Sequence, residues 1–216
     1  MVSPFKFDVD AVFCVSLRER QDKRDRFASE IASRISNPVA FHLMDKDANP
    51  LRATYESHRA LALMALEQGW ARILVFEDDA KAYALRASSI RWINRFVNRQ
   101  PFEALHLGYA MGRTWLTWFP FIARGRVTAT HAYILSLEGC RVFAAAPYDG
   151  GTLDALFKKC IDQHCAYPML FRRASLTADG DGVLARHEDA QWQRNWDRHV
   201  RSPLKYLWKT LLRPGF

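Results

Sequence analysis

The sequence predicts an α/β fold, in which helices flank a mostly parallel central sheet within a single domain. Apolar runs of strand length alternate with segments of helical periodicity through the first half of the chain, and this order is typical of parallel sheets covered by helices. The run 11–17 is apolar at nearly every position, as expected for a strand that is buried on both faces. A length of 216 residues is enough for one sizeable core. We expect the domain to span 1–186, followed by a basic aromatic segment at 187–216.

The first half of the chain is expected to alternate strand and helix. We expect, in order, a strand at 11–17, a helix through Phe27 to Ile35, a strand at 39–43, a helix at 52–68 and a strand at 73–76. In the first helix, Phe27, Ile31 and Ile35 recur on one side. The second helix ends where it does because Gly69 is the residue type that most often closes a helix.

The second half is expected to continue this alternation after an irregular middle. We expect, in order, a helix through Ile90 to Val97, a strand at 104–107, loops with short strands at 108–130, a strand at 132–135, helices through Cys140 to Phe143 and Leu153 to Cys160, and a last strand at 167–171. Ser88 or Ser89, Ser136 and Thr152 are placed to cap the three helices. The segment 108–130 is rich in Trp, Gly and Pro and is expected to form a wall of a binding site.

Composition limits the possible partners of the chain without naming one. The content is 49% hydrophobic and 25% charged, as in ordinary globular proteins. No run approaches the roughly 18 apolar residues of a membrane span, and the first residues lack a secretory signal, so we expect a cytoplasmic protein. The four cysteines form no Cys-x-x-Cys pair and are expected to be reduced. The net charge of +8 favours acidic partners.

Three acids, Glu77, Asp78 and Asp79, follow the strand 73–76 directly. Side chains two apart on a strand point the same way, so Glu77 and Asp79 are expected to project together and Asp78 to oppose them. Crowded carboxylates repel one another and are costly to desolvate, and a cation that relieves this at a strand end commonly holds a phosphate. The alternative is that the acids cap a sheet edge in water.

Two common α/β classes are excluded by missing residues. A signalling receiver domain needs an aspartate at the end of a later strand, and 121–131 contains none. A dinucleotide-binding fold needs Gly-x-Gly-x-x-Gly after an early strand, and the residues after position 17 lack it.

Three functions remain open. In a nucleotide-sugar-dependent glycosyltransferase, one carboxylate binds a sugar hydroxyl of the nucleotide, and another holds Mg²⁺ or Mn²⁺ against the leaving diphosphate. A metal-dependent phosphoesterase would use the same acids. A basic module that binds membranes or nucleic acid would explain the charge but not the acids, which repel phosphates. We therefore expect no nucleic-acid partner.

Six different short motifs follow one another along about residues 11–171. They are Val15-Ser16-Leu17 with Lys23-Arg24, Ser57-His58 with Glu77-Asp78-Asp79, Leu105-His106-Leu107-Gly108, the segment Thr130 to Gly139, Leu153-Asp154, and Tyr167-Pro168-Met169-Leu170. In this order they resemble glycosyltransferase family 25, which contains bacterial lipopolysaccharide and lipooligosaccharide galactosyltransferases and their collagen-modifying relatives. The chain departs from the family in the short, aromatic segment between Gly108 and Thr130, and the match fades beyond Phe171.

The resemblance implies a GT-A-type domain, a UDP-sugar donor (UDP-galactose, by analogy with the family), and a glycan or glycolipid acceptor such as a lipopolysaccharide core. It implies that Asp79, with Glu77, holds the metal and that Glu77 or Asp78 contacts the ribose or a metal-bound water. The residues that it places near the donor are Ser16, Lys23, Arg24, His58 and His131. For His58 and His131 the alternative is a buried structural role.

The resemblance also implies inversion at the transferred sugar, because the bacterial members form β-linkages from α-linked donors. Inversion needs a general base that takes the proton of the acceptor hydroxyl. Asp154 is our candidate, since it is a carboxylate at a helix start and lies far in sequence from the metal acids. The alternative for Asp154 is a helix-start acid that only interacts with the helix dipole. Asp149 and Glu188 are the fallback bases.

The end of the chain is basic and aromatic. Leu204, Leu207, Trp208 and Leu211 recur on one helical stripe, with lysines and an arginine at other positions. This pattern favours an interfacial helix on anionic lipid, which would place the protein peripherally on the inner face of the membrane. Packing of the same helix against the domain core is the alternative.

Overall fold

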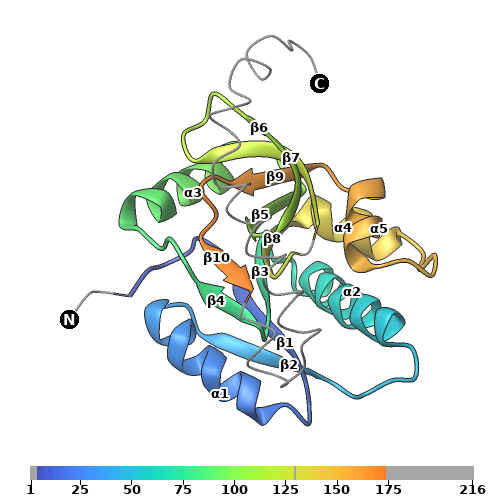
Figure 1. Ribbon diagram of the computed structural model, residues 1–216. Helices are drawn as coiled ribbons and strands as arrows, with labels where there is room; N and C mark the ends of the chain where they lie inside the picture. Colours follow the sequence, from blue (N-terminus) through green and yellow to red (C-terminus); the bar gives the residue numbers. More distant parts are fainter. Residues whose placement is uncertain (1–3, 129, 174–216) are drawn as a thin grey trace.

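The computed structural model describes residues 4–128 and 130–173 (Figure 1). Its main strands are β1 (Ala11–Leu17), β2 (Val39–Met44), β3 (Arg72–Glu77), β5 (Ala104–Gly108), β6 (Met111–Leu116), β7 (Ile122–Thr128), β8 (Ala132–Ser136) and β9 (Gln163–Ala166). Its α-helices are α1 (Gln21–Glu30), α2 (Pro50–Gln68), α3 (Ala87–Arg99), α4 (Leu137–Ala145) and α5 (Leu153–Cys160). The segment 187–216, with its expected membrane helix, lies outside the described residues, as does the fallback base Glu188.

The eight main strands form one sheet in the order β2-β1-β3-β8-β5-β9-β7-β6. β1 pairs in parallel with β2 and β3, and β5 pairs in parallel with β9. β8 is antiparallel to both of its neighbours, and β7 is antiparallel to β9 and β6. The α/β class is therefore confirmed, while the sheet is mixed: six strands run one way and two run the other.

The reversed strands come from one long, bent hairpin. β5 continues into β6 after two residues, and β7 continues into β8 after three. The two arms pair as β6 with β7 at the turn and as β5 with β8 at the base, and β9 lies between the arms. Segment 108–130 thus contains two full strands, where the sequence predicted loops with short strands, because its alternation is interrupted by Gly112 and Gly125.

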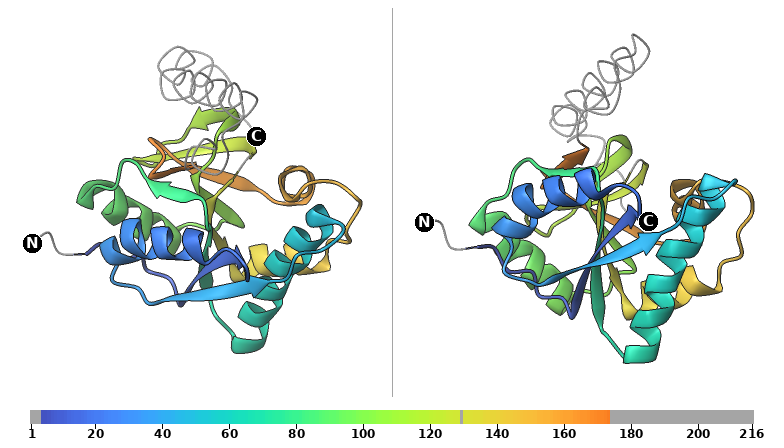
Figure 2. Two further views of the ribbon diagram at one scale, coloured as in Figure 1. Left: turned by 60° about the horizontal axis from the view of Figure 1, so that its bottom comes forward. Right: turned by 90° about the horizontal axis from the view of Figure 1, so that it is seen from below.

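Helices cover both faces of the sheet (Figure 2). Alternate residues of one strand enter two different cores, Val12 and Cys14 on one face and Phe13 and Val15 on the other. The first core contains apolar residues of α1 and α3, and the second contains apolar residues of α2, α4 and α5. Among the described residues, no helix has the length and apolar content needed to cross a bilayer.

Most expected helix ends are confirmed. Gly69 ends α2 with a φ of 65°, and Ser136 and Thr152 accept hydrogen bonds at the starts of α4 and α5. The predicted serine cap of α3 is wrong: Arg86 occupies the cap position without a side-chain hydrogen bond, and Ser89 is buried within the first turn of the helix. The first backbone N–H groups of α3 therefore do not donate to a serine hydroxyl at the cap position, contrary to the prediction from the sequence.

Two expected elements have different bounds. α1 ends at Glu30, and Ile31 and Ile35 are buried beyond it around a short 3₁₀ turn at Ala32–Arg34. The strand expected at 167–171 is replaced by β9 before it and by β10 (Phe171–Arg173) after it. β10 pairs antiparallel with β4 (Ala80–Ala82), a short strand directly after the three acids.

Candidate active site

The three acids lie where β3 leaves the sheet, beside the end of β1. Val15 pairs with Glu77 in the β1–β3 register, so the turn after β1 reaches the acids. Ser16 Oγ donates a hydrogen bond of 2.7 Å to Asp78 Oδ2, and Lys23 Nζ lies 3.7 Å from Asp78 Oδ1. Burial raises the pKa of Asp78, while the Ser16 bond and the Lys23 charge oppose that rise.

Asp79 is held by an arginine from the far end of the described chain. β10 places Arg173 opposite Ala80, and Arg173 Nε donates a hydrogen bond to Asp79 Oδ2. Asp79 is only 6% exposed, and its Oδ1 has no hydrogen-bond partner among the described residues. A buried carboxylate oxygen without a donor is costly, so this atom is suited to an additional positive group.

Glu77 lies among carboxylates from two parts of the chain. Desolvation raises its pKa well above the usual glutamate range, and the charges of Asp79 and Asp154 raise it further. Its backbone N–H donates to the carbonyl oxygen of His131 at 3.0 Å. Glu77 thus interacts electrostatically with Asp79 and also with Asp154, which follows Asp79 by 75 residues.

Asp154 is placed by the first turn of α5 and by Thr130, which precedes β8 by two residues. Thr152 caps the helix by accepting from the Ala155 N–H. Thr130 donates to Asp154 Oδ1 through both its backbone N–H (3.2 Å) and its hydroxyl (2.9 Å). Because β8 pairs with β3, this contact fixes Asp154 on the side of the acids.

Among the other predicted donor residues, Arg24 faces the protein backbone. It is 8% exposed and donates to the carbonyl oxygens of Leu17 (2.6 Å) and Arg18 (2.9 Å). Arg24 thus stabilises the turn after β1, and Lys23 is the neighbouring cation that faces the acids.

The two predicted histidines are both buried. His58 Nδ1 shares a hydrogen bond of 2.5 Å with the Tyr133 hydroxyl, and burial lowers its pKa to about 3, so the ring is neutral at pH 7. His131 Nε2 lies 3.3 Å from the carbonyl oxygen of Phe171, and its ring packs against Gly108 so closely that a Cβ there would be 2.6 Å away. Both contacts fit the structural alternative.

The sequence analysis missed two residues of this site, Arg173 and Thr130. Arg173 follows the last recognised motif and is 94 residues from its partner Asp79, so no local spacing connects them. Thr130 was placed in a motif, and its two donors to Asp154 depend on the β8 register. Asp149, a fallback base, instead accepts from the Gly151 N–H and from Lys159 Nζ, both at 3.1 Å.

The donor atoms of the site suit a hard divalent cation, which binds oxygen ligands. Asp79 Oδ1 and the Glu77 carboxylate would hold it, and water and ligand phosphates would complete its coordination. Within the described chain, no three His, Cys, Asp or Glu side chains form a ready-made metal site. Metal binding therefore remains a prediction.

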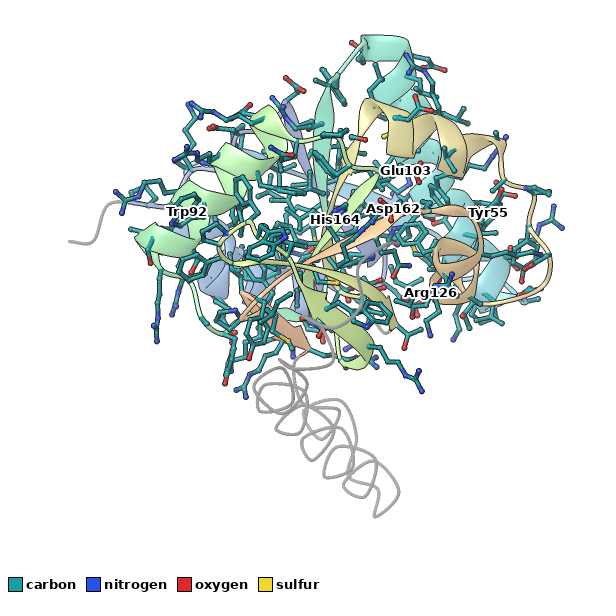
Figure 3. The ribbon with its side chains drawn as sticks, turned by 90° about the horizontal axis from the view of Figure 1, so that it is seen from above. Tyr55, Trp92, Glu103, Arg126, Asp162 and His164 are labelled. Atoms are coloured by element: carbon teal, nitrogen blue, oxygen red, sulfur yellow. The ribbon has the colours of Figure 1, made fainter. Side chains whose placement is uncertain are left out.

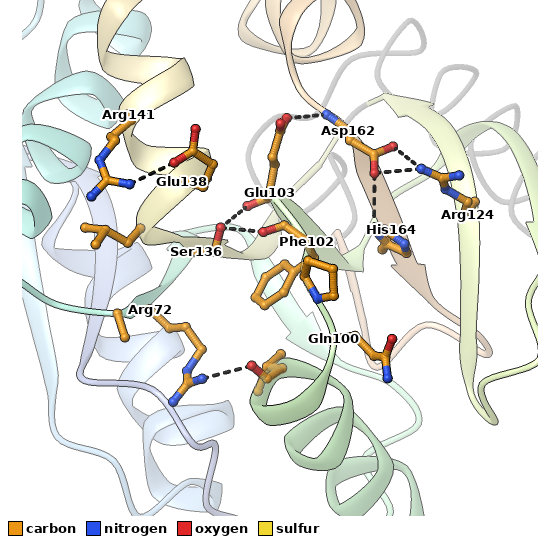
Figure 4. Close-up of a pocket in the computed structure, with 14 residues that line it drawn as sticks. Arg72, Gln100, Phe102, Glu103, Arg124, Ser136, Glu138, Arg141, Asp162 and His164 are labelled. Atoms are coloured by element: carbon orange, nitrogen blue, oxygen red, sulfur yellow. Dashed lines mark hydrogen bonds and ion pairs between the residues drawn. The ribbon is translucent and has the colours of Figure 1, made fainter. Parts of the chain in front are cut away.

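A separate cavity of about 630 Å³ lies at the opposite edge of the sheet from the acids, that is, at the ends where strands β3, β5 and β9 begin (Figure 3). Its charges are largely paired: Arg124 contacts Asp162 at 2.8 Å and Arg141 contacts Glu138 at 2.8 Å (Figure 4). Arg72 Nη1 donates to the carbonyl oxygen of Val97 at 2.8 Å. We assign no chemistry to this cavity, because its side chains mainly hold the strand starts together.

Neither a family model nor a curated protein matches the sequence, so membership of family 25 remains a prediction. Solved structures with a similar chain path include A197 from STIV (TM-score 0.45, 8% identity, 80% of this chain and 95% of that chain). A UDP-glucose pyrophosphorylase complexed with UDP-glucose has a TM-score of 0.44 and 11% identity, over 85% of this chain and 81% of that chain. A glycosyltransferase involved in glycosylation of the major capsid of PBCV-1 has a TM-score of 0.37 and 11% identity, over 85% and 99%. The case for function rests on the residues of the site.

Proposed function

We propose that this chain is a glycosyltransferase that transfers a sugar from a nucleotide-sugar donor to a glycan or glycolipid acceptor. One observation carries the proposal: the carboxylates that end β3 meet a separate carboxylate, Asp154, which is anchored by Thr130 on a different element. Transfer with inversion needs these two functions side by side, a site for the leaving diphosphate and a base for the acceptor.

On the donor side, Asp79 and Glu77 would hold Mg²⁺ or Mn²⁺, which supplies positive charge to the leaving diphosphate. Asp78 is an acceptor suited to a ribose hydroxyl, and Ser16 and Lys23 fix its orientation. Arg24 acts indirectly by holding the turn between β1 and α1, the helix that carries Lys23. His58 and His131 support the wall behind the acids through Tyr133 and Phe171.

On the acceptor side, Asp154 accepts the proton of the attacking hydroxyl. The two Thr130 donors bind Oδ1 and thereby fix the rotamer of the carboxylate. The donor implied by the resemblance is UDP-galactose, and the implied acceptor is a lipopolysaccharide core at the inner face of the membrane. These finer identities follow from the resemblance, and they are the first substrates to test.

The test is calorimetry of UDP binding with and without Mn²⁺, on the parent and on Asp79→Ala. We expect UDP to bind the parent more tightly with Mn²⁺ and the variant to lose this dependence, because the buried Oδ1 ligand is gone. Glu138→Ala is the matched control, since Glu138 is an exposed acid at the opposite edge of the sheet. Equal UDP binding by parent and Asp79→Ala, without a metal effect, would show that the acids are structural.

A further inference from the structure

A second cavity, of about 760 Å³, lies between the β6–β7 hairpin, the end of α5 and the start of β9. Arg113 and Trp115 from β6, Arg126 from β7, Lys158 from α5 and Gln163 from β9 contribute to its lining. Asp162 also lines it and lies in the same end of the molecule as Arg126 (Figure 3). None of these residues has a role in the function proposed above.

The register of the hairpin gathers positive charge on one face. Arg113 lies directly opposite Arg126, and Trp115 lies directly opposite Arg124. Residues two apart on a strand share a face, so all four side chains belong to the same face of the hairpin. Like charges directly opposite each other destabilise a sheet. An anion bound between the two side chains would relieve this repulsion.

The charges of this face are only partly neutralised. Arg124 is paired with Asp162. Within 4–128 and 130–173, Arg113, Arg126 and Lys158 form no ion pair, and all three are exposed. The cavity thus offers three cations to an incoming ligand.

Lys158, which lines the cavity, lies one turn along α5 from the candidate base Asp154. Asp154 and Lys158 are four residues apart, so they lie on one face of the helix and are separated by about 6 Å of helical rise. That spacing is close to the length of one sugar ring. The half-buried ring of Trp115 supplies an aromatic face of the kind that packs on sugars.

We propose that this cavity binds the acceptor and selects one that carries a phosphate or carboxylate about one sugar ring from the hydroxyl that Asp154 activates. Arg113, Arg126 and Lys158 bind the anionic group, and Trp115 contacts the ring. The inference rests on the proposed function for the role of Asp154, and it adds the chemical class of the acceptor.

The first test measures binding without the donor. Glucose 6-phosphate, glucuronic acid and glucose are titrated into the full chain and followed by NMR. We expect one or both anionic sugars to bind at least about ten-fold more tightly than glucose, with a difference that falls in high salt. The double variant Arg113→Gln/Arg126→Gln should abolish that preference. Lys159→Gln is the matched control, because Lys159 lies on α5 but is paired with Asp149.

The outcomes separate this inference from the proposed function. If UDP binds with Mn²⁺ but the charged sugars bind no better than glucose, the acceptor class is wrong and the glycosyltransferase proposal stands. If the sugars bind as expected but UDP does not, the cavity is confirmed as an anionic-sugar site and the donor proposal fails. Tighter binding of a short oligonucleotide than of either sugar, lost in the same double variant, would overturn the assignment to a sugar.

Discussion

Asp154→Asn separates donor binding from transfer, because asparagine keeps the shape of the residue and cannot take a proton. The Asn Oδ1 can still accept both hydrogen bonds from Thr130. The lost charge at the start of α5 costs about 0.3–1 kcal/mol, and the relieved repulsion toward Glu77 offsets part of this cost. The melting temperature should therefore change by no more than about 2–4 °C.

Transfer should fall much further than stability. General base catalysis contributes about 10²–10⁴-fold, and a hundred-fold loss corresponds to about 2.7 kcal/mol of activation free energy. The assay compares transfer from UDP-galactose to a panel of glycan acceptors, together with UDP affinity, at matched folded fraction. Asp149→Asn is the control, since Asp149 is an acid of the preceding loop that is bonded to Gly151 and Lys159. Near-parental turnover in Asp154→Asn, or an equal loss in Asp149→Asn, would remove Asp154 from the mechanism.

Two further substitutions test the packing of the domain. His106 is fully buried with neither ring nitrogen hydrogen-bonded among the described residues, and burial lowers its pKa to about 3. The unfolded chain binds this proton below about pH 6.5, so stability is lost as the pH falls. The melting temperature of His106→Leu should be no lower than that of the parent at pH 7.5. At pH 5.5 the variant should keep about 1.4 kcal/mol more of its free energy of unfolding than the parent keeps. Parallel profiles of stability against pH for the two proteins would contradict this. Gly139→Ala should destabilise α4 by about 1–3 kcal/mol, although alanine favours helices, because its Cβ would lie 2.1 Å from the Glu103 carbonyl oxygen. A higher melting temperature would refute the clash.

The elements that the sequence predicted well depend on local chemistry. Strand β1 has its expected bounds, and Gly69 closes α2, because apolar continuity and a left-handed cap are properties of a few adjacent residues. The acids after β3 were found for the same reason. Three charges in a row stand at the end of this strand, which a buried sheet does not otherwise tolerate.

The rest of the site depends on register between distant strands. Whether Arg173 reaches Asp79 is decided by the pairing of β10 with β4. Whether Arg113 faces Arg126 is decided by the β6–β7 register. A shift of one residue in either pairing would turn the side chains to the other face, and periodicity within one strand does not specify its partner. The role of Arg24 was also hidden, because a basic residue near an acidic site can bind either the ligand or the turn beside it.

The crowding of Glu77 against Asp79 and Asp154 has a consequence for how this protein evolves and is engineered. Natural proteins accept such local strain only where activity repays it. A selection for heat resistance alone would tend to neutralise Glu77, which both other carboxylates crowd, and under the proposed function the survivors would be more stable but inactive. The acids should therefore be held fixed in any stabilised version, and gains in melting temperature should be sought at the opposite edge of the sheet.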